Sequence, residues 1–389
     1  MSSWLLWSQG EFRRALRRLL SNPGRCFTAG RERRIALRPA PTTIRSHRGR
    51  VNTSGPCYTS GMTPLVRAPL LALGVATLCV QAFLWAQAPA PETVIHRVDR
   101  ARLIRDVTTL TSPAFEGRRT GSPGALKVRQ WLMDEFREAG LTPRGTNGFL
   151  QPFTLTSRDS GPSPASGSSA QVGGAAANVI GLVPGRERQR KLLVITAHYD
   201  HLGIRDGVLY PGADDNASGV AVLLAAARHF VRNPPRHPMM FAALDAEEIG
   251  LRGARALIDS PVLPRNGIAM AINLDMVSRS AANEIFAAGT YHTPWLTPLV
   301  EDVQRRSVVR IRLGHDRPTS LASGLADWTR LSDHGPFHEA GVPFVYFGVE
   351  DHGDYHKSSD TADRIDPRFF GDTADMIVDA VRTFDTRVD

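Results

Sequence analysis

Histidines and carboxylates that could bind a metal ion or carry a proton recur in this sequence beside short apolar runs. They are His198 and Asp200, Asp215, Glu247 and Glu248, Asp275, and His356 with the neighbouring Tyr355. Histidine nitrogen and carboxylate oxygen are both ligands of catalytic Zn²⁺, and a carboxylate that binds no metal can act as a general base. The residue types therefore allow a metal-dependent active site, provided that the fold brings these segments together.

Each segment taken alone has an ordinary explanation. A His-x-Asp pair arises often by chance, and Asp-Asp-Asn at residues 214–216 is a common start of a helix, where a carboxylate caps the first turn. Paired glutamates after a strand are usually solvated. Five such segments in one chain are not explained in this way. A shared site would explain them, because open α/β sheets collect their functional residues at the carboxyl ends of strands.

The elements that must position these residues are strands alternating with helices. Apolar runs bounded by turn residues predict strands at residues 178–183, 192–197, 239–244, 268–274, 284–287 and 342–349. Helical spacing of apolar residues predicts helices at residues 101–110, 124–139, 217–231, 293–305 and 367–383. Residues 158–177 are rich in Ser, Gly, Ala and Pro and are expected to form a loop. The alternation predicts a layered α/β domain with a largely parallel, buried sheet.

The positive charge of the chain lies in its first 61 residues. The 389-residue sequence has a formal net charge of +9 at pH 7, and residues 1–61 alone contain twelve arginines, no lysine and two glutamates. From Met62 onward the charges nearly balance, so no nucleic-acid partner is expected for the main body. We expect residues 1–61 to be disordered, or an extension that precedes the biological start.

Residues 62–88 have the three parts of a secretory signal peptide. A short start with one arginine is followed by the apolar residues 68–85, and Ala86-Gln87-Ala88 forms an A-x-A cleavage site before a Pro-rich stretch. We therefore expect a secreted or periplasmic protein, cleaved near Ala88, with residues 89–389 as the catalytic domain. The alternative is a retained membrane anchor, because the apolar run is about long enough to span a bilayer.

The main body contains no cysteine, which excludes thiol chemistry there. The three cysteines, Cys26, Cys57 and Cys79, all precede residue 90, so a cysteine protease or a cysteine zinc site is ruled out for the body. A P-loop lysine, a Gly-x-Ser-x-Gly elbow and a His-Glu-x-x-His zinc helix are also absent from the sequence. The histidine and carboxylate segments remain as the candidate site.

Five segments, in order along the chain, resemble the motifs of the family of di-zinc aminopeptidases that also contains glutamate carboxypeptidase II and glutaminyl cyclase. They are AHYDHLG, PGADDNASGVAVLLAAA, LDAEEIGLRGA, INLDMV and YHKSSDT, supported by FEGRRTGSPG, ANVIGLVPG and SDHGPFHEAGVPFVYF. The resemblance covers about residues 98–385. It implies the zinc-exopeptidase fold, a three-layer α/β domain whose central mixed, mostly parallel sheet is flanked by helices.

The resemblance also implies a set of metal ligands. It assigns His198 and Asp275 to one zinc ion, Glu248 and His356 to the other, and Asp215 to both as a bridging carboxylate. The implied cofactors are two Zn²⁺, although Co²⁺ or Mn²⁺ would suit the same nitrogen and oxygen donors. Two such ions can bring the pKa of a bridging water from ~15.7 towards ~7, which supplies a hydroxide at neutral pH.

Three further residues receive roles from the resemblance. Glu247 is implied to be the general base, Asp200 the carboxylate that orients a metal-bound imidazole, and Tyr355 a hydrogen-bond donor to the tetrahedral oxyanion. Tyr355 is equally well explained as a packing residue, since members of the family do not all place a tyrosine here. The peptide bond between Asp215 and Asn216 is implied to be cis.

The expected function is an exported metallo-aminopeptidase that removes N-terminal residues from peptides. A carboxypeptidase or a glutaminyl cyclase of the same family is the alternative enzyme, and a non-catalytic binding relative is the alternative from another class. The complete set of ligands with Glu247 argues against the last. The sequence indicates neither the preferred terminal residue nor the oligomeric state, and it predicts contact with a membrane only if residues 68–85 are retained.

Overall fold

The strands of the central sheet alternate with helices along the chain. The computed structural model describes residues 96–155, 176–187, 189–264, 266–318, 321 and 324–389. The predicted extension and signal peptide, and most of the predicted loop at 158–177, lie outside these residues. The strands of the sheet are β1 (Thr142–Pro143), β2 (Leu150–Phe153), β3 (Ala176–Val183), β4 (Leu192–His198), β7 (Met239–Leu244), β8 (Ile268–Leu274), β9 (Glu284–Ala288), β10 (Arg310–Leu313) and β11 (Phe344–Gly348).

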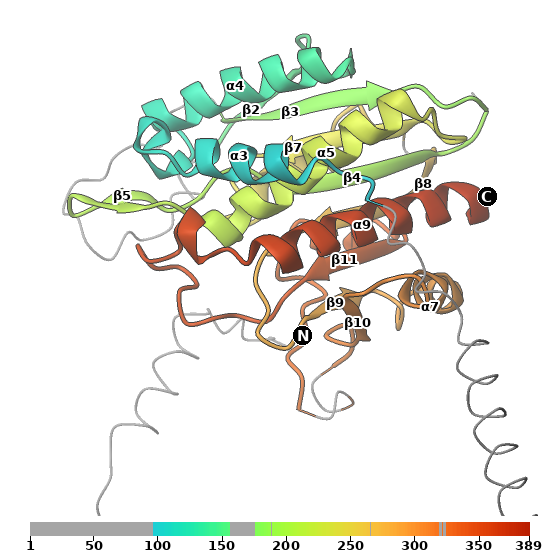
Figure 1. The fold of residues 1–389 in the computed structure, drawn as a ribbon. Helices are drawn as coiled ribbons and strands as arrows, with labels where there is room; N and C mark the ends of the chain where they lie inside the picture. Colours follow the sequence, from blue (N-terminus) through green and yellow to red (C-terminus); the bar gives the residue numbers. More distant parts are fainter. Residues whose placement is uncertain (1–95, 156–175, 188, 265, 319–320, 322–323) are drawn as a thin grey trace, which may run out of the picture. The chain divides into compact units, whose positions relative to one another are not determined.

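The sheet is mixed, with four adjacent parallel strands at its centre. The strand order is β1-β3-β7-β4-β8-β11-β9-β10, and β2 also pairs with β3. Strands β7, β4, β8 and β11 run parallel to their neighbours in this group, while β3 and β9 join its two sides as antiparallel partners. The carboxyl ends of the four central strands therefore meet at one edge of the sheet. A separate hairpin, β5 (Gly203–Arg205) and β6 (Val208–Tyr210), extends beyond it (Figure 1).

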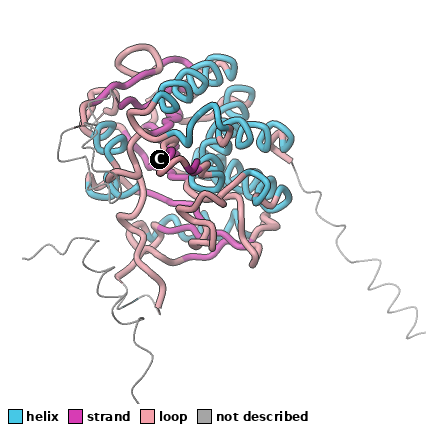
Figure 2. Tube along the Cα trace, turned by 90° about the vertical axis from the view of Figure 1, so that its left-hand side faces the viewer, coloured by secondary structure: helices cyan, strands magenta, loops and turns pink. Residues whose placement is uncertain are grey.

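Helices cover both faces of this sheet. They are α3 (Arg100–Leu110), α4 (Pro123–Ala139), α5 (Gly219–Arg232), α6 (Arg252–Ile258), α7 (Thr297–Gln304), α8 (His334–Glu339) and α9 (Pro367–Arg387). Helices α3, α4, α5 and α9 lie together on one face (Figure 1) and share one apolar core with it. Helices α6 and α8 pack on the other face through a second core, so the strands lie between two helical layers (Figure 2).

Strand β4 shows why the sheet is buried on both faces. Every residue of its sequence LLVITAH is buried. Leu193 and Ile195 belong to the core beneath α5, whereas Leu192 and Val194 belong to the core beneath α6. A strand that is apolar on both faces is stable only at the centre of a covered sheet, and this places its last residue, His198, at the edge where the four strands end.

The predicted layered α/β fold is confirmed. Strands β7 and β8 have the predicted bounds, and α3 and α4 begin one residue earlier than predicted. The short elements β1, β2, β5, β6, β10, α6 and α8 were not predicted, because two to seven residues carry too little periodicity. The helix predicted at 293–305 begins with a 3₁₀ turn at Pro294–Leu296. No helix of the described ranges combines the length and the apolar character needed to cross a membrane.

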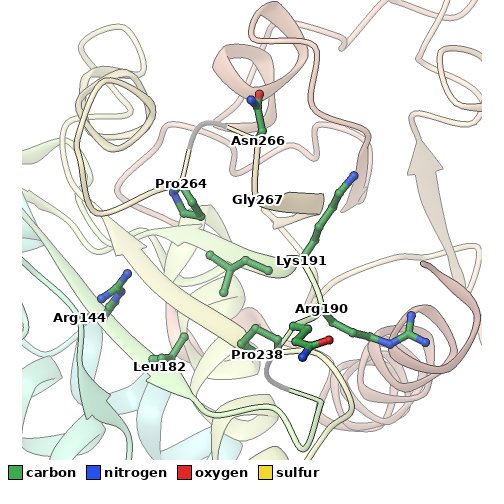
Figure 3. A pocket seen from close by; sticks show the side chains of 10 residues that line it. Arg144, Leu182, Arg190, Lys191, Pro238, Pro264, Asn266 and Gly267 are labelled. Atoms are coloured by element: carbon green, nitrogen blue, oxygen red, sulfur yellow. The ribbon is translucent and has the colours of Figure 1, made fainter.

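A surface cavity of about 390 Å³ opens at the amino ends of the central strands, opposite the carboxyl ends (Figure 3). Its lining includes Leu192, the first residue of β4, and Pro238 and Gly267, which directly precede β7 and β8. Arg144 and Lys191 also line it, while none of the predicted site residues does. The cavity therefore lies at the amino ends of the strands and is separate from the candidate site.

Candidate metal centre

The predicted site residues converge at the carboxyl ends of the four central strands. His198 ends β4, Asp275 directly follows β8, and Glu247 and Glu248 lie in the turn after β7. His356 and Tyr355 belong to the loop after β11, and Asp215 lies in the short turn Ala213–Ser218 that leads into α5. Parallel pairing thus brings together residues that are up to about 160 positions apart in the sequence.

One group of donors contains His198, Asp275 and Asp215. The Nε2 atom of His198 lies 3.2 Å from Oδ1 of Asp275 and 3.5 Å from Oδ1 of Asp215. Nδ1 of His198 faces the backbone carbonyl of Asp200 at 3.2 Å, and the Ser332 hydroxyl donates to the other oxygen of Asp275 at 2.7 Å. These three side chains are buried and could hold one metal ion.

A second group surrounds the other oxygen of Asp215. Nε2 of His356 lies 3.1 Å from Oδ2 of Asp215 and 3.2 Å from Oε2 of Glu248. His201 also lies here, with Nδ1 2.8 Å from Oε1 of Glu248, and it forms a possible metal site with Asp215 and Glu248. His201 was missed by the sequence reasoning, although it stands inside the first motif, three residues after His198. Asp215 is therefore shared between two groups.

The backbone around Asp215 is held by neighbouring side chains. Asp360 accepts hydrogen bonds from the backbone N–H groups of Asp214 and Asp215, each at 3.1 Å. The side chain of Asn216 donates to the carbonyl of Leu274 at the end of β8. The peptide bond between Asp215 and Asn216 is cis, as the resemblance implied. These contacts tie the loop that carries Asp215 to the strand that carries Asp275.

Glu247 differs from Glu248 in having no partner for its side chain. Within the described residues, the Glu247 carboxylate makes no hydrogen bond or ion pair, and burial raises its pKa well above the usual value. Burial would also raise the pKa of Glu248, but the imidazoles of His201 and His356 hold it well below the usual value. Glu247 is thus the more basic carboxylate, and it is free to take a proton.

The carboxylate of Asp200 accepts hydrogen bonds from backbone N–H groups and also faces the imidazole of His198. It accepts hydrogen bonds from the backbone N–H groups of Glu247 at 3.0 Å and Glu248 at 3.3 Å. The nearer carboxylate oxygen of Asp200 lies 3.7 Å from Nδ1 of His198. The backbone carbonyl of Asp200 is closer to the same nitrogen, at 3.2 Å. Orientation of the imidazole by the Asp200 side chain stays a prediction, while its contacts position the turn that carries both glutamates.

Tyr355 packs against a predicted ligand. Its ring stacks on His356 with the ring centres 3.9 Å apart, and it contacts the larger apolar core. Burial raises its pKa above the usual value, so the hydroxyl remains a proton donor at neutral pH. The structure therefore supports its packing role directly, and the Tyr355 hydroxyl has no hydrogen bond to the residues that the structure describes.

The donor atoms fit a bound cation. Nδ1 of His201, Oδ2 of Asp215 and Oε1 of Glu248 are buried, and no hydrogen-bond partner for them exists in the part of the chain that the structure describes. Two carboxylates buried side by side favour a positive charge between them, and nitrogen with carboxylate oxygen is the donor set of catalytic zinc. The residues present therefore fit the metal that the resemblance implies.

Solved structures place this fold among the zinc exopeptidases. The chain superposes on BSAP, a zinc aminopeptidase from Bacillus subtilis, with a TM-score of 0.57 and 18% identity, over 77% of this chain and 97% of that one. A Zn-dependent exopeptidase from Parabacteroides distasonis gives a TM-score of 0.57 at 17% identity, over 75% and 99% of the two chains. Glutaminyl cyclase from Bacteroides thetaiotaomicron gives 0.56 at 16% identity, over 73% and 98%.

The sequence comparison identifies the family. Residues 178–381 match the model of peptidase family M28, and the chain belongs to that family, which confirms the predicted resemblance. Aminopeptidase YwaD of Bacillus subtilis (strain 168) is 30% identical over 219 residues, 52% of this chain and 44% of the relative. A probable zinc metalloprotease of Pyrenophora tritici-repentis is 30% identical over 214 residues, 46% of each protein. The chain thus spans about half the length of the curated relatives it matches.

Proposed function

We propose that this protein is an exported aminopeptidase that uses two zinc ions to remove N-terminal residues from peptides. The observation that carries the proposal is the position of Asp215, whose two oxygens face two separate groups of donors. Membership of a peptidase family whose relatives are named as an aminopeptidase and zinc metalloproteases supports the same activity.

The chain's own residues would hold the two metals in the arrangement that the resemblance implies. His198 and Asp275 would hold one ion, Glu248 and His356 would hold the other, and Asp215 would contribute a carboxylate oxygen to each. When bound, the ions polarise the scissile carbonyl and lower the pKa of a bound water so that it becomes a nucleophile at neutral pH. Cobalt or manganese would satisfy the same donors.

Glu247 would carry the proton through the reaction. Its free carboxylate accepts the proton of the attacking water and returns it to the nitrogen of the leaving amine. The raised pKa of Glu247 suits both steps, because a stronger base takes the proton and its conjugate acid still releases it. The Tyr355 hydroxyl donates a hydrogen bond to the oxyanion formed from the peptide carbonyl.

Export rests on the sequence alone. The pattern of residues 62–88 supports secretion or transport to the periplasm with cleavage near Ala88. The substrates would then be peptides outside the cytoplasm.

The function is tested by hydrolysis of a panel of substrates by the mature protein. We expect release of p-nitroaniline from unblocked aminoacyl-p-nitroanilides, no activity on N-blocked or C-terminal reporter peptides, and loss of activity with a chelator that added Zn²⁺ reverses. Bound zinc should be two equivalents. Cleavage of the C-terminal reporters, or cyclisation of a peptide with N-terminal glutamine in place of hydrolysis, would instead establish one of the alternative activities.

Gly212 offers a test of the loop that carries Asp215. Gly212 has φ +59, and a Cβ there would lie 2.1 Å from the carbonyl oxygen of Asp215 and 2.5 Å from ring atoms of His201. We expect Gly212→Ala to weaken zinc binding by at least ~10-fold, as loss of a supporting group does, measured by titration of the metal-free protein. Gly207→Ala is the matched control, because Gly207 has φ +76 and an added Cβ meets nothing within 4 Å. Equal zinc affinity in the two variants would contradict this role of Gly212.

A further inference from the structure

Asp245 carries a buried carboxylate that is fixed to the rest of the fold from two sides. It directly follows β7, and its Oδ2 atom accepts hydrogen bonds from Arg129 of α4 at 3.2 Å and from the backbone N–H of Ala177 in β3 at 3.1 Å. Its own backbone N–H donates to the side chain of Asn178 at 3.0 Å. Both Asp245 and Arg129 are buried, so this carboxylate has a fixed position shortly before Glu247 in the chain.

Asp200 holds the turn that carries the two glutamates, but few side chains hold Asp200. Its carboxylate is buried and accepts hydrogen bonds from the backbone N–H groups of Glu247 and Glu248. The imidazole of His198 lies 3.7 Å away, beyond hydrogen-bond distance. Among the described residues, the hydroxyl of Thr120 is the one side-chain group within hydrogen-bond distance of this carboxylate. The position of the Asp200 side chain therefore depends on Thr120.

Thr120 lies between the two aspartates. Its hydroxyl oxygen is 2.8 Å from Oδ1 of Asp245 and 3.2 Å from Oδ2 of Asp200, and the residue is only 6% exposed. The hydroxyl has a single hydrogen, which it can donate to either carboxylate. Two buried carboxylates repel each other, and a donor between them reduces that repulsion. The hydroxyl thus keeps Asp200 beside the fixed carboxylate of Asp245, and the hydrogen bonds of Asp200 extend this connection to the turn with the glutamates.

We propose that Thr120 is a positioning residue for Glu247, acting through Asp200 and the hydrogen bond that Asp200 accepts from the Glu247 backbone. The Glu247 carboxylate has no hydrogen-bond partner of its own in the described ranges, so the backbone contacts of this residue set where its carboxylate lies. A displacement of about 1 Å in a reacting group can cost ~10²-fold in rate. The inference deepens the proposed function and rests on Glu247 as its general base.

The test measures kcat, KM and zinc content of the full-length protein, with an aminoacyl-p-nitroanilide at saturating Zn²⁺. Thr120→Val nearly keeps the size of the side chain and removes the hydroxyl. We expect kcat to fall by ~10–100-fold, with KM and zinc content nearly unchanged because every proposed ligand stays in place. Thr120→Ser keeps the hydroxyl and should restore most of the lost turnover.

A double-mutant cycle with Glu247→Gln tests whether Thr120 acts through Glu247. The positioned carboxylate is absent from the Glu247→Gln protein, so adding Thr120→Val should change the residual kcat by less than about 3-fold. Two independent effects would instead multiply, because their free energies would add. Thr120→Ala also lacks the hydroxyl and leaves more space around the two carboxylates, so it takes the place of Thr120→Val in the cycle if the valine variant fails to fold.

Thr111→Val is the matched control. Thr111 is also a buried threonine, 9% exposed, at the end of α3, where its hydroxyl donates to the carbonyl of Val107 at 2.9 Å. Its replacement removes a buried hydroxyl that contacts no carboxylate, and it should leave kcat unchanged.

The outcomes separate the positioning role from a structural one. An unchanged kcat in Thr120→Val, a loss that Thr120→Ser or Thr111→Val shares, or the same fold loss with and without the Glu247 carboxylate overturns the role of Thr120. The proposed function would stand in each of these cases. A wild type that releases no p-nitroaniline at saturating Zn²⁺ contradicts the proposed function itself.

Discussion

Glu247→Gln is expected to remove nearly all turnover while the protein keeps both zinc ions. Glu247 is outside the two groups of donors and its carboxylate is unpaired among the described residues. The substitution therefore leaves every proposed ligand in place and takes away only the proton acceptor. We expect kcat to fall by ~10²–10⁴-fold, the usual effect of a lost general base, with KM and zinc content nearly unchanged. Steady-state kinetics with elemental analysis of the same samples measures both.

Glu248→Gln is the matched comparison, because the adjacent residue undergoes the same change of charge. Glu248 contacts His201 and His356 at the second group of donors, so its replacement should lower zinc content together with activity. Added zinc should restore part of the activity. Loss of zinc in the Glu247 variant, with both ions retained in the Glu248 variant, would mean that the two roles are reversed.

Arg118→Met is expected to cause the largest loss of stability. Arg118 is fully buried and donates to four backbone carbonyls, those of Leu110, Tyr199, Pro211 and Gly212, at 2.6 to 2.8 Å. Burial lowers its pKa to about 10, so the guanidinium stays charged at neutral pH. It joins the loop after β4 to the loop that carries Asp215.

Methionine fills similar space but donates no hydrogen bond. Four buried carbonyls would lose their donor, at roughly 1–3 kcal/mol each, so the free energy of unfolding should fall by on the order of 4 kcal/mol or more. Zinc affinity should fall as well, because one loop carries Asp215 and the other directly follows His198. Denaturant unfolding at saturating and at zero zinc separates the two effects.

The neighbouring Arg119 provides the control for Arg118. Arg119 is exposed, and Arg119→Met should change the free energy of unfolding by no more than about 0.5 kcal/mol. Arg118→Lys keeps the charge and fewer donors, so we expect it to lie between wild type and Arg118→Met. Similar stability of the Arg118 and Arg119 methionine variants would show that the buried guanidinium does not hold the two loops.

The sequence alone determined the class of fold and where the candidate donors lie along it. Strands β7 and β8 were predicted with their observed bounds because a run of apolar residues that ends at Asp245 or Asp275 is a local signal. The ordered motifs then named His198, Asp215 and Asp275, and the structure places Nε2 of His198 within 3.5 Å of an oxygen of each aspartate. Short elements such as α6 and α8 escaped prediction because they bury their apolar residues only against the finished sheet.

Only the tertiary structure decided which side chains share the centre beyond those motifs. His201 reaches Glu248 because the chain turns after β4 and Gly212 leaves room for the ring, and neither fact can be read from spacing. Arg118 lies about 80 residues from the carbonyl of Tyr199 that it binds. Such contacts depend on the direction in which a side chain points after its strand ends, and on which buried polar groups still need a partner. Both are set by packing between distant segments, whereas periodicity and motif order are set by neighbours in the chain.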